Sequence, residues 1–226
     1  MAKLLDPTRI NTVIFDMDGT VLYTLDDLKT ATNVILRQYG YPERSLDEVR
    51  QFVGNGIRKT IERAVPADVA ENQELIDLMF TDFQKYYDVH CLDETRPYDG
   101  ILELMDTLKA KGYKMAIVSN KVDTAVKELN QHFFGDRVPV AIGEKPGVKK
   151  KPAPDTVFAA LEELGSTKEE SVYIGDSDVD FNTALNSDMP CISVLWGFRD
   201  RDFLERMGAS TFAQKPEDIL GLLQVK

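Results

Sequence analysis

Two carboxylates near the start of this 226-residue chain are the first candidates for chemistry. Asp16 and Asp18 lie two residues apart, directly after the apolar run Thr12–Phe15 and before Gly19. Residues two apart on a strand face the same side, and a turn at Gly19 would leave both carboxylates in one crevice. One carboxylate of such a pair can attack as a nucleophile while the other acts as acid and base. Because two close anions repel each other, the pair also favours a bound cation.

A second acidic motif follows another apolar run late in the chain. Asp176 and Asp180 come directly after the run Ser171–Ile174. Hard carboxylate oxygens of this kind suit Mg²⁺, which commonly pairs with substrate phosphate. Taken alone, the motif is equally well explained as an acidic first turn of a helix.

Polar and basic residues at two further places complete the candidate set. Ser119 and Asn120 follow the apolar run 116–118, and their hydroxyl, amide and backbone N–H groups can bind phosphate oxygens. As an isolated signal, the same pair could instead cap the next helix. Lys151 precedes Pro152 and Pro154, which restrict the backbone around it. Its positive charge would offset an excess of carboxylate and phosphate oxygens.

The elements that must position these side chains alternate along the chain. Short apolar runs predict strands, and segments with helical periodicity lie between them; the strands are expected at 12–15, 114–118, 138–142, 171–174 and 191–195. This alternation predicts an α/β fold with a doubly wound parallel sheet. The carboxyl ends of parallel strands share one edge of the sheet, so we expect all four clusters to meet there.

A helical insertion interrupts this pattern after the first strand. Between about residues 24 and 93 only helices are predicted, one of them opened by the capping-box sequence Ser45–Glu48. We therefore expect an α/β core of residues 1–21 and 97–226 and an all-helical insertion of residues 22–96. An insertion at the edge that carries the chemistry is well placed to act as a lid, and an incidental decoration is the alternative.

Charge and composition exclude several classes of partner. The chain has 27 Lys and Arg against 38 Asp and Glu, a net charge of −11, which disfavours nucleic acid but not small phosphorylated ligands. No apolar run approaches the ~20 residues that cross a bilayer, and the first residues lack the apolar core of a signal peptide. Cys91 and Cys191 are too few for a disulfide framework. We therefore expect a cytoplasmic protein without a membrane partner, as a monomer or a homodimer.

In their order and placement, the four motifs resemble those of the haloacid dehalogenase superfamily of phosphohydrolases. They are Asp-Met-Asp-Gly-Thr at 16–20, Ser-Asn at 119–120, Lys-Pro-Ala-Pro at 151–154 and Gly-Asp-Ser-Asp-Val-Asp at 175–180. The helical insertion is similar to the α-helical cap of that superfamily. Three further stretches, at 53–56, 96–100 and 194–199, make the chain most similar to the phosphoglycolate phosphatases within it.

The resemblance implies a role for each motif residue. Asp16 would form an aspartyl-phosphate, and Asp18 would protonate the leaving alkoxide and then activate water. Ser119 and Lys151 would bind the transferring phosphoryl group, with help from the backbone N–H of Asn120. The resemblance also implies a Mg²⁺ cofactor, held by Asp16, the carbonyl group of Asp18, and Asp176, with Asp180 orienting the site.

Three residues of the insertion are candidates for substrate contacts. They are Asn55, Gly56 and Arg58. The planar guanidinium group of Arg58 suits a substrate carboxylate, although an exposed helix charge explains this residue equally well.

The leading functional hypothesis is therefore a Mg²⁺-dependent phosphomonoesterase acting on a small phosphorylated metabolite, with 2-phosphoglycolate as the first candidate. A pyrophosphatase, a sugar-phosphate phosphatase and a phosphoglucomutase remain open within the superfamily. A signalling switch phosphorylated on Asp16 is the non-enzymatic alternative. Asp18 argues against the switch, because a neighbouring acid and base would speed breakdown of the phosphoryl group that a switch must keep.

Overall fold

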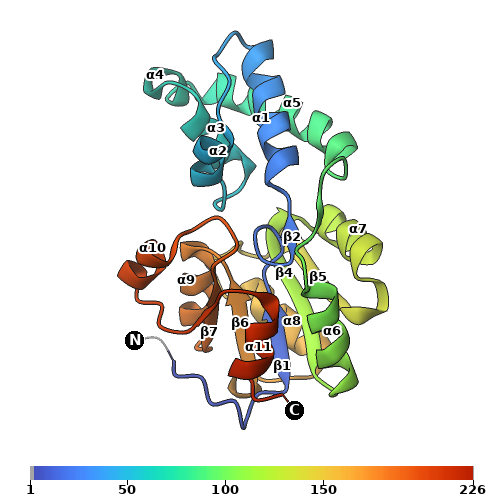
Figure 1. Ribbon diagram of the computed structural model, residues 1–226. Helices are drawn as coiled ribbons and strands as arrows, with labels where there is room; N and C mark the ends of the chain where they lie inside the picture. Colours follow the sequence, from blue (N-terminus) through green and yellow to red (C-terminus); the bar gives the residue numbers. More distant parts are fainter. Residues whose placement is uncertain (1–2, 226) are drawn as a thin grey trace. The chain divides into compact units, whose positions relative to one another are not determined.

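The computed structural model describes residues 3–225, and the chain forms two compact units (Figure 1). The first unit, called the core here, joins the residues up to Leu22 to those from Pro97 onward. The second, called the helical unit, comprises Tyr23–Arg96. Each unit is described by itself below.

The core is built on a six-stranded parallel sheet in the order β5-β4-β1-β6-β7-β8. Its strands are β1 (Thr12–Phe15), β4 (Lys114–Val122), β5 (Val140–Glu144), β6 (Ser171–Gly175), β7 (Cys191–Val194) and β8 (Phe212–Ala213). Strand β1 lies between β4 and β6, so Phe15 pairs with Ile117 on one side and Ile174 on the other. After β5 the chain crosses to the opposite side of β1, and this reversal creates the crevice in which doubly wound sheets bind ligands.

Helices cover both faces of this sheet, which explains why every residue of β1 is buried. Val13 and Phe15 share a core cluster with residues of α6 (Ile101–Ala110), α7 (Asp123–Phe133) and α11 (Pro216–Leu222). Ile14 points to the other face and packs in a cluster with residues of α8 (Asp155–Leu164) and α9 (Asp178–Asn186). The alternation of successive side chains along a strand therefore divides the apolar run of β1 between two cores. The remaining elements of the core are η1 (Gly135–Arg137), η2 (Lys168–Glu170) and α10 (Arg201–Met207).

The helical unit has five helices: α1 (Leu25–Gln38), α2 (Leu46–Phe52), α3 (Ile57–Ala64), α4 (Ala67–Ala70) and α5 (Gln73–His90). The predicted capping box is confirmed, because Ser45 and Glu48 bond each other's backbone N–H groups at the start of α2. The carboxylate of Asp27 accepts hydrogen bonds from the N–H groups of Glu94 and Thr95, which ties α1 to the end of the unit. Strands β2 (Leu22–Tyr23) and β3 (Arg96–Pro97) pair where the chain passes between the units.

The predicted α/β architecture is confirmed, with local corrections. Strand β4 runs to Val122 instead of ending at Val118, and its register against β5 shifts between these two residues. Phe158 in α8 is apolar but 44% exposed, because Val157, Ala160 and Leu161 occupy the buried face of that helix. The sequence patterns did not predict α10, β8 or α11.

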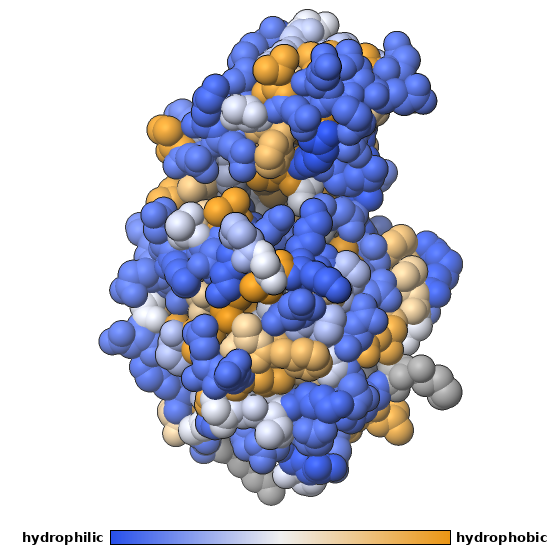
Figure 2. Space-filling view, turned by 180° about the vertical axis from the view of Figure 1, so that it is seen from behind, coloured by the Kyte–Doolittle hydropathy of each residue, from blue (hydrophilic) through white to orange (hydrophobic). Residues whose placement is uncertain are grey.

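Within residues 3–225, none of the helices is both long enough and apolar enough to cross a bilayer. Figure 2 shows a face on which hydrophilic residues predominate and apolar ones are interspersed.

Candidate active site

The first acidic motif forms a tight loop at the carboxyl end of β1. The N–H of Asp16 donates to the carbonyl of Ile174 at 2.8 Å, so Asp16 continues the pairing of β1 with β6. The loop then closes on itself through a hydrogen bond from the N–H of Gly19 to the carbonyl of Leu22. Gly19 has a φ of 88°, and a Cβ atom there would lie only 2.6 Å from Asp176 Oδ2. Glycine is therefore required both for the turn and for the close approach of the two acidic motifs.

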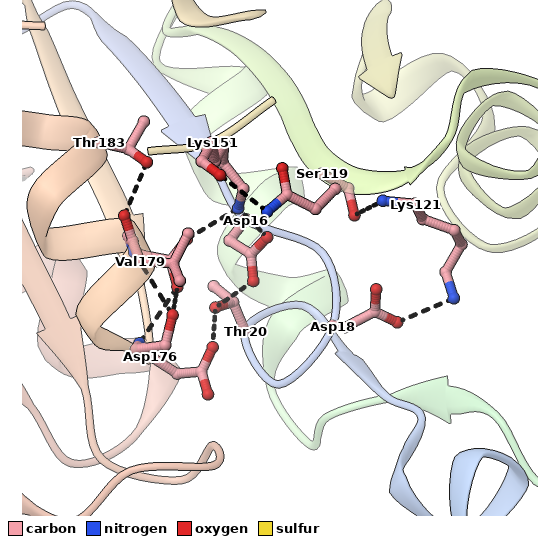
Figure 3. Close-up of polar contacts among 12 residues, drawn as sticks. Asp16, Asp18, Thr20, Ser119, Lys121, Lys151, Asp176, Val179 and Thr183 are labelled. Atoms are coloured by element: carbon pink, nitrogen blue, oxygen red, sulfur yellow. Dashed lines mark hydrogen bonds and ion pairs between the residues drawn. The ribbon is translucent and has the colours of Figure 1, made fainter. Parts of the chain in front are cut away.

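Three carboxylates and one ammonium group meet at this edge of the sheet (Figure 3). The carboxylate oxygens of Asp16, Asp176 and Asp180 lie within 4.8 Å of one another, and all three residues are buried. Lys151 Nζ lies 2.5 Å from Asp16 Oδ1 and 2.8 Å from Asp180 Oδ1. The cluster thus gathers residues that lie more than 130 positions apart in the sequence.

The excess of negative charge in this cluster shows in its pKa values. Burial, together with the facing carboxylates of Asp180 and Asp176, raises the pKa of Asp16 well above its usual value despite the attraction of Lys151. Burial and the Asp180 carboxylate raise the pKa of Asp176 to about 7. Burial alone would lower the pKa of Lys151, but Asp16 and Asp180 raise it well above its usual value, so the ammonium form persists. A cluster with more carboxylates than cations is chemically suited to a metal ion with oxygen ligands.

A threonine hydroxyl group links Asp16 with Asp176. Thr20 Oγ1 donates to both Asp16 Oδ2, at 3.4 Å, and Asp176 Oδ1, at 3.2 Å, and so bridges the two acidic motifs. The second oxygen of Asp176 accepts the backbone N–H of Phe198 at 2.6 Å. These contacts orient the carboxylates of Asp16 and Asp176 toward each other, which is the arrangement that a shared cation requires.

Asp180 has both carboxylate oxygens engaged by the protein. Oδ1 accepts from Lys151 Nζ and from the Tyr173 hydroxyl group at 3.1 Å, and Oδ2 accepts from Ser177 Oγ at 2.5 Å. Asp180 and Ser177 also form the capping box that starts α9. The alternative reading of this motif as an acidic helix start is therefore correct as well, because the same residues both cap the helix and contribute to the cluster.

Ser119 and Asn120 lie in the irregular end of β4. Ser119 is 2% exposed, and its hydroxyl group accepts the N–H of Lys121 at 3.1 Å. Asn120 Nδ2 donates to the carbonyl of Lys151 at 3.1 Å, so this segment contacts the backbone that carries the buried lysine. The alternative that the pair caps the following helix is wrong, because the N-cap residue of α7 is Val122 and no side chain caps it.

Asp18 lies outside the cluster of three carboxylates. Its side chain is 21% exposed, and Lys121 Nζ lies 3.4 Å from its Oδ1 atom. The two carboxylates of the first motif thus have different environments, since Asp16 is buried against Lys151 and Asp18 is more open to solvent. This is the asymmetry that distinct roles as nucleophile and as acid and base require.

The three candidates in the helical unit are engaged within that unit. Asn55 Oδ1 accepts a hydrogen bond from Arg63 at 2.7 Å, and Gly56, with a φ of 89°, is the N-cap residue of α3. The guanidinium group of Arg58 contacts the carboxylate of Asp77 and donates to Gln73 Oε1 at 2.7 Å. Their assignment to substrate binding stays a prediction.

Several groups of the site were absent from the sequence-based set. The hydroxyl groups of Thr20 and Tyr173 and the side chain of Lys121 contact motif residues directly. The N–H of Phe198 is a backbone donor, which residue type does not reveal. Its neighbour Gly197 offers a signal, because a Cβ atom there would overlap Asp176 and the carbonyl of Gly19.

The comparison with known proteins assigns the family. Residues 13–194 match the sequence profile of the haloacid dehalogenase-like hydrolases. The chain belongs to this family. The resemblance drawn from the four motifs is therefore confirmed.

Similar proteins within this family support the relationship over most of the chain. A phosphoglycolate phosphatase of Caulobacter vibrioides is 31% identical over 225 residues, covering 94% of this chain and 92% of that protein. A pyrophosphatase PpaX of Listeria monocytogenes is 27% identical and covers 96% of this chain and 97% of that protein. A crystal structure from Lactobacillus delbrueckii subsp. bulgaricus has a TM-score of 0.90 and 34% identity, covering 95% of this chain and 98% of that one. The family's fold is thus shared across both units.

Proposed function

We propose that this chain is a Mg²⁺-dependent phosphomonoesterase that forms an aspartyl-phosphate on Asp16. The observation that carries the proposal is the buried cluster of Asp16, Asp176, Asp180 and Lys151 at the carboxyl edge of the sheet. Phosphoryl transfer depends chiefly on positioning and on neutralising charge, and this cluster supplies an oxygen nucleophile beside a fixed cation. The phosphatase names of several relatives support the same activity.

Of the three clustered carboxylates, those of Asp16 and Asp176 are better placed to bind a metal ion than that of Asp180. Asp16 and Asp176 are bridged by Thr20, whereas the carboxylate of Asp180 is held away from that bridge by donors on Lys151, Tyr173 and Ser177. We assign Asp16 and Asp176, with the carbonyl group of Asp18, to Mg²⁺, and Asp180 to holding Lys151. When bound, Mg²⁺ would neutralise the oxygens of the phosphoryl group and of the nucleophile.

The reaction has two steps. In the first, a carboxylate oxygen of Asp16 attacks phosphorus, the bond to the leaving oxygen breaks, and Asp18 gives that oxygen its proton. In the second, Asp18 takes a proton from water as the water attacks phosphorus, which releases phosphate and restores the Asp16 carboxylate. Lys151 and the Ser119 hydroxyl group would hold the phosphoryl oxygens in both steps, with the Asn120 N–H.

The first candidate substrate is 2-phosphoglycolate. Relatives named phosphoglycolate phosphatase support this choice over 82% to 94% of the chain. Pyrophosphate is the second candidate, supported by the relative named pyrophosphatase PpaX. Both leaving groups are small anions, so the helical unit is where we place the discrimination, with Asn55, Gly56 and Arg58 as the candidate contacts.

The test is hydrolysis of a panel of phosphates by the wild-type protein and by Asp16→Asn. We expect the near-isosteric variant to lose at least about a thousandfold in kcat/KM, about 4 kcal/mol of transition-state stabilisation, with an unchanged circular dichroism spectrum. A chelator should stop turnover and Mg²⁺ should restore it. Asp82→Asn, a surface change in the helical unit, is the control and should keep full activity. Turnover by Asp16→Asn at the wild-type rate would refute the nucleophile.

A further inference from the structure

A second lysine approaches the first acidic motif from the opposite side to Lys151. Lys121 comes from the end of β4, and its side chain is 7% exposed. Its ammonium group lies 3.4 Å from Asp18 Oδ1, and Figure 3 shows the side chain extending to the Asp18 carboxylate. The two carboxylates of the motif thus face different lysines: Asp16 pairs with Lys151, and Asp18 pairs with Lys121.

The oxygen that faces Lys121 has an unusual environment. Asp18 Oδ1 is buried and accepts no hydrogen bond from any of the residues that the structure describes. A buried oxygen without a hydrogen-bond donor destabilises the folded protein, and the cost is greater for a charged group. The charge of Lys121 is positioned to offset that cost and to hold the carboxyl group in one orientation.

The backbone of β4 explains how Lys121 reaches this position. The register of β4 against β5 shifts between Val118 and Val122, so the residues in between depart from the regular ladder. Ser119 Oγ accepts the N–H of Lys121, which fixes the start of the excursion. Asn120 donates to the carbonyl of Lys151 from the same segment. One irregular segment therefore carries Lys121 and contacts the backbone of Lys151.

We propose that Lys121 is a positioning residue that holds the Asp18 carboxyl group where it can reach the leaving oxygen of the substrate. This inference rests on the proposed function, in which Asp18 is the acid and base. Asp18 stands on a loop and is 21% exposed, so without a partner its side chain is free to rotate away. A misplacement of about 1 Å in a catalytic group can cost about a hundredfold in rate.

Because Lys121 is proposed to act by positioning Asp18, its loss should have a specific kinetic effect. Departure of an alkoxide requires a proton from Asp18, whereas departure of 4-nitrophenolate, a stable anion, does not. Loss of Lys121 should therefore slow the first step for an alkyl phosphate and spare it for an aryl phosphate. The parameter kcat/KM reports that first step, and kcat also contains the second step, in which Asp18 serves both substrates.

The experiment compares Lys121→Met with the wild-type protein on 2-phosphoglycolate, glycerol phosphate and 4-nitrophenyl phosphate. We expect kcat/KM for both alkyl phosphates to fall about 10- to 100-fold and kcat/KM for the aryl phosphate to change less than about threefold. Lys121→Arg should restore most of the loss, because it keeps a cation at the same place. Lys127→Met, which removes an exposed lysine paired with Asp123 on α7, is the matched control and should change neither value. Should Lys121→Met fail to fold, Lys121→Gln gives the same comparison with a polar head group.

A double-mutant cycle tests whether Lys121 acts through Asp18. In the Asp18→Asn background, Lys121→Met should lower kcat/KM for the alkyl phosphates no further. Additive losses, equal losses on alkyl and aryl phosphates, or no loss at all would each overturn the proposal. A wild-type protein that hydrolyses none of the three substrates would instead refute the proposed function, so the two failures are distinguishable.

Discussion

The charged cluster at the sheet edge of the core differs in burial from the ion pairs of the helical unit. At the sheet edge, the side chains of Lys151, Asp16 and Asp180 are 3%, 8% and 2% exposed. In the helical unit, the pair of Lys85 and Asp82 joins side chains that are 72% and 27% exposed. Exposed pairs contribute about 0–1 kcal/mol, whereas burying charge costs more than the pairing typically returns.

This contrast indicates that the exposed pairs and the buried cluster have different roles. Surface pairs in the helical unit connect residues of the same or neighbouring helices and need no explanation beyond solubility and modest stability. The buried cluster has a surplus of carboxylates that raises the pKa values of Asp16 and Asp176, so folding stability does not explain it. A divalent cation would balance the charge of the ionised carboxylates, which is the physical basis of the proposed metal site.

Removal of the buried lysine should give the largest difference between the two regions. Lys151→Met leaves Asp16 and Asp180 facing each other without their shared cation, so we expect the free energy of unfolding to fall by about 3–5 kcal/mol. Each kcal/mol corresponds to roughly 2–4 °C in Tm for a protein of this size. Phosphatase activity should fall at least about a hundredfold, because the phosphoryl group loses its fixed cation. Thermal unfolding and steady-state kinetics measure the two effects.

The matched change in the helical unit is Lys85→Met. It removes the exposed pair with Asp82, and we expect the free energy of unfolding to change by less than about 1 kcal/mol. Activity should be unchanged. If the two lysine variants had the same stability, the contrast between buried and exposed charge would be contradicted.

The next largest effect is expected in the pH dependence of the free energy of unfolding, because the buried cluster contains carboxyl groups with raised pKa values. Burial and the Asp180 carboxylate raise the pKa of Asp176 from 3.8 to about 7, so the folded state binds this proton more tightly than the unfolded chain does. Its contribution to stability is therefore fully present below pH 3.8 and is lost as the pH rises toward about 7. Asp16, whose pKa is also raised, acts in the same direction. Metal-free protein should thus have a lower free energy of unfolding at about pH 8 than at about pH 5.

Urea unfolding at the two pH values, with and without Mg²⁺, makes this measurement. Asp176→Asn should show a smaller loss of stability between the two pH values, because its amide does not titrate. Mg²⁺ should stabilise the wild-type protein more at the higher pH, where the carboxylates are ionised and can bind it. An equal pH dependence in the wild-type protein and in Asp176→Asn would show that Asp176 keeps its ordinary pKa.

For Arg58→Ala in the helical unit, we expect a small effect on stability and an effect on substrate selectivity. Arg58 pairs with Asp77, which is 65% exposed, so the free energy of unfolding should change by less than about 1 kcal/mol. If Arg58 binds the substrate carboxylate, kcat/KM for 2-phosphoglycolate should fall about tenfold, or about 1.4 kcal/mol, while the value for ethyl phosphate is unchanged. Unchanged selectivity between these substrates would remove Arg58 from the recognition set.

Local patterns were sufficient to predict most of the helices and strands and the four motifs. The apolar run of β1 and the capping box at Ser45 depend on residues a few positions apart, so periodicity and capping rules predict them. The apolar side chain of Phe158 does not by itself indicate its 44% exposure, because successive residues of a helix point about 100° apart. The exposed position of that side chain depends on what the helix packs against, which its own sequence does not contain.

The chain's order of residues by itself determined that carboxylates, a hydroxyl group and a lysine stand at the ends of parallel strands, and hence that they belong to one edge of a sheet. Which of these groups are in contact depends on the tertiary structure. The register shift in β4 brings Lys121 to Asp18. The hydroxyl group of Thr20 lies between the two acidic motifs, and the N–H of Phe198 donates to Asp176. Strand formation and parallel pairing follow from periodic, repetitive interactions that neighbouring residues encode. Contacts between loops depend on the three-dimensional course of backbone segments that are not neighbours in the sequence, and no local pattern specifies that course.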